Sequence, residues 1–144
     1  MRASRIFVLT AILICSACNT MEPQPDDPLD GDFRSIQYIL PGPTDGAVDV
    51  QNAGGFVEAT LAEGHHISGR IVIPENISPG FTPGETLFDG TYELNADTVL
   101  FRFNNPEGLN QSLGKMHWDA AKQTLETPGE MLGRGPFKLV LEKN

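Results

Sequence analysis

The chain has 144 residues, of which 40% are hydrophobic and 20% charged, so it is long enough for one small domain with a hydrophobic core. Nineteen acidic residues against ten basic ones give a formal net charge of -9. Such a surface repels phosphates, which excludes nucleic acid as a partner. The two cysteines, Cys15 and Cys18, both lie near the N-terminus. The body of the chain therefore has neither a disulfide framework nor a cysteine-rich metal site.

The first 17 residues have the pattern of a bacterial export signal. Two arginines precede an apolar run over residues 6–14, which is shorter than the about 20 apolar residues that a membrane span needs. Two small residues then stand directly before Cys18. This pattern resembles the lipobox of bacterial lipoproteins, which implies that Cys18 carries a diacylglycerol and becomes the mature N-terminus. Within that resemblance, Asn19 favours the outer membrane over the inner one. An ordinary cleaved secretory signal and an uncleaved apolar anchor are the alternatives.

Residues 18–31 are predicted to form a tether between the lipidated cysteine and a folded domain. Residues 19–30 contain three prolines and four acidic residues and almost no side chain that could enter a core. Proline stiffens such a segment, and the acidic groups keep it away from an anionic bilayer. We therefore expect the folded domain to span residues 32–144.

From Asp32 onward apolar and polar residues alternate, and Gly, Pro, Asn and Asp interrupt the alternation at short intervals. This period of two is typical of β-strands with one buried face. In the first strand it places Ile36, Tyr38 and Leu40 on the same face. No later segment has helical periodicity. The predicted strands span residues 33–40, 56–61, 66–73, 87–94, 98–103, 113–119, 122–126 and 137–142.

Eight consecutive strands without intervening helices predict an all-β fold. A single antiparallel up-and-down barrel buries one face of every strand and removes the exposed sheet edges. A two-sheet β-sandwich is the alternative architecture.

The second half of the domain carries a resemblance. A Gly-x-Tyr strand and hairpin over residues 90–101 precede a strand containing Trp118 and a last strand over residues 137–143 that ends near a lysine. This order resembles that of small bacterial lipocalin-like lipoproteins. It covers about half of the folded domain and implies a lipocalin-like barrel.

The predicted inner face has no charged side chain, so it cannot perform acid–base chemistry. Small residues opposite aromatic ones would leave a narrow apolar pocket, for which the candidate ligand-binding residues are Gly69, Gly90, Tyr92, Phe101, Met116 and Trp118, although the size of an eight-stranded barrel favours a filled interior. The alternative is a core filled by side chains, in which the glycines mark bends of the sheet.

The polar residues show no arrangement that is typical of a catalytic site. His65 and His66 are adjacent in sequence and point to opposite faces of a strand, so they cannot easily bind one metal ion together. Ser68 has no Gly-x-Ser-x-Gly context, and Asp89 is predicted to face solvent. We therefore expect no enzymatic activity, no metal site and no cofactor.

Three predicted loops stand out by their length or their apolar residues: residues 74–86, residues 104–111 with Leu109, and residues 128–135 with Met131 and Leu132. Their apolar residues indicate a lid, a contact surface or a seal over the end of the barrel. The predicted function is a cell-envelope lipoprotein, held to the membrane by its lipid anchor, whose barrel binds a small apolar ligand. The alternative is a structural or protein-interaction lipoprotein, an accessory subunit or an inhibitor, with a solid barrel core and an envelope protein as partner.

Overall fold

The computed structural model describes residues 27–42, 46–77, 82–129 and 136–144. Within them the protein is all-β, as the sequence predicts, with one short 3-10 helix, η1 (Glu107–Gln111). The predicted signal sequence and Cys18 lie outside the described residues. The strands are β1 (Gly31–Pro41), β2 (Ala47–Asp49), β3 (Phe56–Ala62), β4 (His66–Ile73), β5 (Gly84–Asn95), β6 (Thr98–Asn105), β7 (Lys115–Asp119), β8 (Thr124–Glu126) and β9 (Lys138–Lys143).

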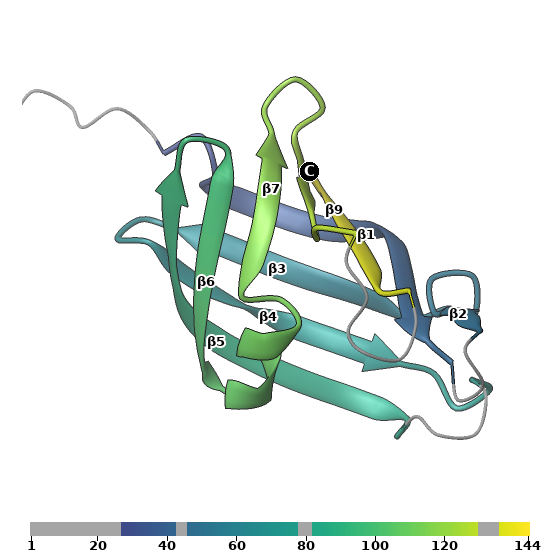
Figure 1. The fold of residues 1–144 in the computed structure, drawn as a ribbon. Coiled ribbons are helices and arrows are strands. Elements are labelled where there is room, and N and C mark those ends of the chain that lie inside the picture. The colour runs from purple at the N-terminus through teal and green to yellow at the C-terminus, as the bar shows by residue number, and fades with distance from the viewer. Residues whose placement is uncertain (1–26, 43–45, 78–81, 130–135) are drawn as a thin grey trace, which may run out of the picture.

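The strands form one closed antiparallel sheet. Their order is β2-β1-β3-β4-β5-β6-β7-β8-β9, and pairing between β1 and β9 joins the two sides. In Figure 1 the first strand and the yellow last strand lie side by side, and β6 and β7 cross in front of β3 and β4. The predicted barrel is thus confirmed, and the alternative sandwich is not the observed architecture.

Short strand β2 is the addition that the sequence did not predict. It pairs with residues 39–41 of β1, whereas residues 31–34 of β1 pair with β3. A turn over residues 50–55 separates β2 from β3, and Val50 within this turn is fully buried. Because the three residues of β2 are followed by a glycine-containing turn, the local sequence resembles a loop.

Alternation along the strands separates a buried inner face from an exposed outer face. The buried side chains come from every long strand and form one cluster: among them are Phe33, Val57, Leu61, Ile67, Phe88, Tyr92, Val99, Phe101, Met116, Trp118, Leu125, Leu139 and Leu141. In β3 and β6 the inward residues are those that the period of two predicts. The polar residues of these strands lie outside.

A bulge in β1 corrects the predicted facing of that strand. The register with β9 shifts between Ser35 and Gln37, and such a bulge adds one residue to one strand of a pair. Phe33 and Ser35 therefore face inward before the bulge, and Tyr38 faces inward after it. Ile36, expected to share the inner face with Tyr38, is 52% exposed.

Residues 27–30 close one end of the barrel, and we call them the N-terminal plug. Leu29 is fully buried in the core cluster. The hydroxyl of Tyr92 lies 3.0 Å from carboxylate oxygens of both Asp27 and Asp30, and Lys143 Nζ donates a hydrogen bond to the carbonyl of Pro28 at 2.9 Å. The packed unit therefore begins before Asp32, and these residues of the expected tether belong to the fold. We call this end of the barrel the closed end.

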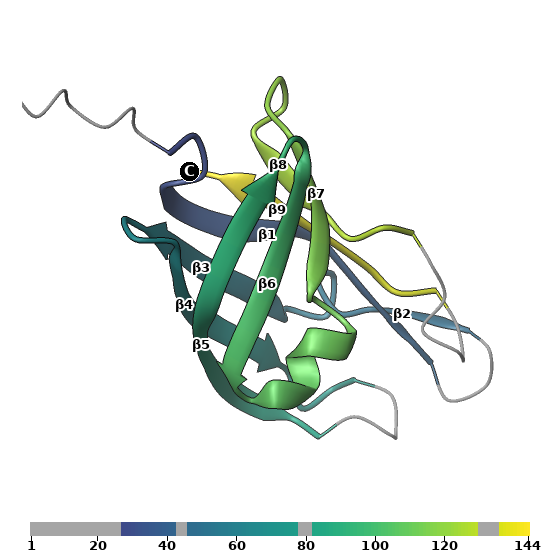
Figure 2. The ribbon, with the colours of Figure 1, turned by 60° about the vertical axis from the view of Figure 1, so that its left-hand side comes forward.

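The opposite end holds η1 and the ends of several strands, and we call it the open end. Strands β1 and β4 run from the closed end toward it, and β5 starts there. Figure 2 shows η1 at the base of β6 and β7, away from the N-terminal plug. The two ends of the barrel are thus built from different parts of the chain.

Replacing Leu29 by alanine should destabilise the protein. A buried leucine changed to alanine loses its apolar contacts and leaves a cavity, so we expect a loss of about 2–5 kcal/mol in the free energy of unfolding, measured by urea denaturation. Leu87→Ala, at a leucine that is 65% exposed, is the matched control and should change the stability by less than about 0.5 kcal/mol. Equal, small effects of both changes would show that Leu29 does not hold the plug in place.

Candidate functional site

Four of the six predicted ligand-binding residues are packed in the core. Tyr92, Phe101, Met116 and Trp118 are each no more than 5% exposed. The ring of Tyr92 lies 6.3 Å from that of Phe101, and the ring of Trp118 meets that of Phe33 edge-on at 6.0 Å. These aromatic contacts occupy space in the middle and the closed half of the barrel.

The two predicted glycines allow close packing around them. A Cβ atom on Gly69 would collide with the carbonyl oxygen of Glu58 and with the ring of Phe88. A Cβ on Gly90 would collide with the backbone of β6, next to a shift in the register between β5 and β6. The missing side chains are thus replaced by neighbouring atoms, and none of the six residues lines the apolar cavity described next.

A cavity of about 480 Å³ lies at the open end of the barrel. It is formed where β1 and β4 end and β5 begins, with η1 and the residues before and in β9 on its other side. Its lining has no charged residue: Tyr38, Leu40, Pro41, Val57, Ile71, Ile73, Thr86, Pro106, Gly108, Leu109, Ser112, Leu113, Phe137 and Leu139. We call this the open-end cavity.

Sequence reasoning placed part of this lining correctly without recognising a cavity. Val57, Ile71 and Leu139 belong to the predicted inner face, and they are buried. Leu109 stood out as an apolar residue in a polar loop, and it is half-buried at the cavity. Met131 and Leu132, noted for the same reason, lie outside the described residues.

Tyr38 is the most buried of the three hydroxyl-bearing residues in the cavity lining. The residue is 5% exposed, and burial raises the pKa of its phenol to about 12. Within the described part of the chain, no group forms a hydrogen bond with this hydroxyl. Of the other two hydroxyls, that of Ser112 donates to the carbonyl of Leu109 at 3.4 Å, and Thr86 lies on an exposed part of β5. Tyr38 is therefore a neutral hydrogen-bond donor on an apolar wall.

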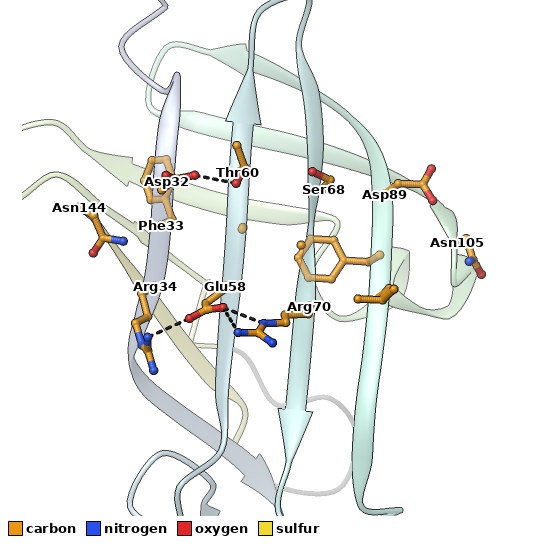
Figure 3. Close-up of a pocket in the computed structure, with 14 residues that line it drawn as sticks. Asp32, Phe33, Arg34, Glu58, Thr60, Ser68, Arg70, Asp89, Asn105 and Asn144 are labelled. Atoms are coloured by element: carbon orange, nitrogen blue, oxygen red, sulfur yellow. Dashed lines mark hydrogen bonds and ion pairs between the residues drawn. The ribbon is translucent and has the colours of Figure 1, made fainter.

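A second hollow, of about 730 Å³, lies on the outer face of β1, β3, β4 and β5 (Figure 3). Glu58 stands between two arginines there: its carboxylate oxygens lie 2.8 Å from Arg34 Nη1 and 2.8 Å from Arg70 Nη2. Both guanidinium groups also lie over the ring of Phe56, at 4.8 and 5.2 Å from its centre. We call these four residues, together with the exposed Leu87, the outer patch.

Both arginines of the outer patch are paired with Glu58, and Arg70 also lies 3.8 Å from Glu85. The hydrogen bond and the negative charge of Glu58 raise the pKa of Arg70. Exposed ion pairs of this kind contribute little to stability because water screens them. The hollow is therefore lined mainly by charged and polar side chains, whereas the open-end cavity has an apolar wall with one tyrosine hydroxyl.

The histidines occupy separate places. His65 lies beside the N-terminal plug, 3.4 Å from Asp27, with its ring 5.3 Å from that of Tyr92. His117 lies 3.5 Å from Asp97 at the other hairpin of the closed end. Among the described residues, no three His, Cys, Asp or Glu side chains are grouped as metal ligands would be. The same residues include no helix long and apolar enough to cross a membrane.

Comparison with known proteins returns no match: no family model, no curated protein and no solved structure is similar to this chain. The functional argument therefore rests on the geometry and chemistry of the two hollows.

A methyl group at Gly90 should overpack the core. Gly90→Ala must displace the backbone of β6, and we expect a loss of about 1–3 kcal/mol in the free energy of unfolding. Gly129→Ala is the control, since a Cβ there meets no atom within 4 Å. If urea denaturation finds Gly90→Ala as stable as the parent protein, space is present beside Gly90 and the filled half of the barrel is misassigned.

Both tyrosines of the chain should resist ionisation in the folded state. Burial raises the pKa of Tyr38 to about 12, and burial followed by the hydrogen bonds with Asp30 and Asp27 raises the pKa of Tyr92 above its ordinary range. Since the folded pKa values exceed the unfolded ones, this contribution to stability is complete below the unfolded pKa of about 10 and is lost as the pH rises through about 12 at Tyr38.

The measurement is the tyrosinate absorbance of the folded protein at about pH 11, where free tyrosine is mostly ionised. We expect little absorbance before urea is added and the signal of two tyrosines afterwards. Full ionisation near pH 10 without urea would contradict the burial of both hydroxyls.

Proposed function

We propose that this protein is a cell-envelope lipoprotein that binds a small apolar molecule in the open-end cavity. The observation that carries the proposal is the cavity itself, with about 480 Å³ of space and no charged lining residue. Cavities that bind small ligands have volumes of roughly 300–1,000 Å³ and mostly apolar walls with a few polar groups. The open-end cavity has this size and this composition.

The architecture around the cavity supports binding by a preformed site. Ile71, Val57 and Leu139 come from paired strands of a closed sheet, so the wall that they form is held by the barrel. An apolar ligand that leaves water for this wall gains about 25 cal/mol for each Å² of apolar surface that it buries. The ligand does not have to open the packed half of the core, because the space for it already exists at the open end.

We propose a binding protein rather than an enzyme. The lining has no Asp, Glu, His, Cys or Lys residue that could act as a general acid, a general base or a nucleophile. Its hydroxyl groups lack a neighbouring base in that lining, and an isolated hydroxyl is a weak nucleophile.

The envelope location in this proposal rests on Cys18 and the residues around it. Nine residue steps separate Cys18 from Asp27, which an extended chain covers in at most about 30 Å. The described chain enters the barrel at the closed end, opposite the cavity. In this proposal a lipid on Cys18 is connected to the barrel through the closed end, where the described chain begins.

A second candidate function is protein binding through the outer patch. Leu87 is 65% exposed there, beside two arginines that lie over a phenylalanine ring. Arginine and aromatic side chains are enriched among the residues that dominate protein interfaces. This function becomes the preferred one if the cavity binds no apolar molecule.

The test is titration with N-phenyl-1-naphthylamine, an uncharged dye whose fluorescence rises in apolar surroundings. We expect a saturable increase with one site per chain. Ile73→Lys places an ammonium group in the cavity wall, and because an unpaired charge there is costly, the affinity should fall about tenfold or more.

Leu87→Lys adds the same charge to the outer patch and is the matched control. The proposed function predicts that this variant binds the dye like the parent protein. The proposal fails if the parent protein gives no saturable signal, or if Leu87→Lys abolishes binding and Ile73→Lys does not.

A further inference from the structure

The lining of the open-end cavity carries no charge, and this restricts the charge of any ligand that it binds. None of its fourteen described lining residues is charged, so this lining itself offers no cation to an anionic ligand. Moving an ionised carboxylate into such surroundings forfeits its hydration without a compensating partner. The lining therefore opposes any ligand whose charged group has to enter.

Charged residues of the described chain lie next to this lining in sequence. Glu85 and Glu107 are exposed and directly adjacent in sequence to the lining residues Thr86 and Pro106, and Glu75 follows β4 by two residues. Lys138, at the start of β9, is basic and lies in sequence between the lining residues Phe137 and Leu139. Glu85 is paired with Arg70 at 3.8 Å, which leaves Glu75 and Glu107 against Lys138 among the described charges near the cavity.

Tyr38 supplies the one specific interaction that the wall offers. Its hydroxyl has no hydrogen-bond partner in the described part of the chain, and the phenol remains protonated at neutral pH. The residue lines the cavity, so water reaches this hydroxyl when no ligand is bound, and a ligand atom that accepts its hydrogen bond replaces that water. Carbonyl, ester and ether oxygens are acceptors without a charge.

We propose that the ligand of the open-end cavity is an uncharged, mainly apolar molecule that carries a hydrogen-bond acceptor, such as a ketone or an ester, and that Tyr38 donates to this acceptor. This inference rests on the proposed function and specifies its ligand class. The volume of about 480 Å³ limits this ligand to a small molecule.

The experiment compares ligands with eight carbon atoms that displace N-phenyl-1-naphthylamine from the parent protein at pH 7.5. They are 2-octanone with a neutral acceptor, 1-octene with no oxygen, octanoate with a negative charge and octylammonium with a positive charge. We expect 2-octanone to compete at about tenfold lower concentration than octanoate, because only the anion loses hydration that the wall cannot replace. Octylammonium should also be weaker than 2-octanone.

Tyr38→Phe tests the donor separately. It should weaken 2-octanone about three- to tenfold, the usual effect of one neutral hydrogen bond, and leave 1-octene unchanged. Tyr92→Phe removes a hydroxyl at the closed end and is the control, for which both ligands should bind as they do to the parent protein. A similar loss for both ligands in Tyr38→Phe would mean that Tyr38 acts through packing alone and would overturn its assigned role.

The outcomes separate this inference from the function on which it rests. Binding of octanoate or octylammonium as tightly as 2-octanone overturns the proposed ligand class and leaves an apolar-ligand-binding protein. Absence of binding by the dye and by all four ligands overturns the proposed function, and the ligand class with it.

Discussion

Pairing between β1 and β9 is the interaction on which the rest of this structure depends. It joins residues near the two ends of the described chain, from the pair of Phe33 with Lys143 to the pair of Ile39 with Lys138. Without it the sheet would have two open edges and no separate interior. The bulge in β1 is part of this closure, since it lets the strand turn while Phe33 and Tyr38 both face inward on either side of it.

The interior divides into two halves with different chemistry. The closed end receives Leu29 and a hydrogen-bonded Tyr92, while large rings occupy the barrel next to them. The open end is lined mainly by aliphatic side chains from strand ends and by η1, and there the space is not filled. A narrow barrel that is packed along its whole length would have no binding site. Here the packing stops before the open end, and the unfilled remainder is the candidate site.

The alternation of residues was sufficient to predict the barrel, because eight of the nine strands were predicted and differ from the prediction by only a few residues at their ends. The bulge at Ser35 and Gln37 could not be predicted in this way, since no glycine or proline marks it. Leu29 was missed for a different reason: a lone apolar residue among prolines and acids has no periodicity. Its burial depends on contacts with strands that are distant in sequence.

The candidate site was harder to predict than the fold. Gly69 and Gly90 allowed two interpretations from sequence, space for a ligand or bends in a filled core, and the close neighbours of both glycines, such as Phe88 beside Gly69, fit the filled core. The cavity instead arises where strands end, which depends on three-dimensional stagger and not on any local pattern. Tyr38 was predicted to share one strand face with Ile36 and Leu40, but its burial beside a cavity, with no hydrogen bond to a described residue, can be seen only in the structure.

The most direct test of this two-part interior is to locate a bound apolar molecule by NMR of methyl groups. On titration with N-phenyl-1-naphthylamine, we expect chemical-shift changes at Ile71, Ile73 and Leu113, which line the open-end cavity. The methyl groups of Leu29 and Leu125, fully buried and outside the cavity lining, should not change. Shifts at Leu29 and Leu125 with none at the open end would contradict the account, because they would place the ligand in the half of the barrel that side chains are said to fill.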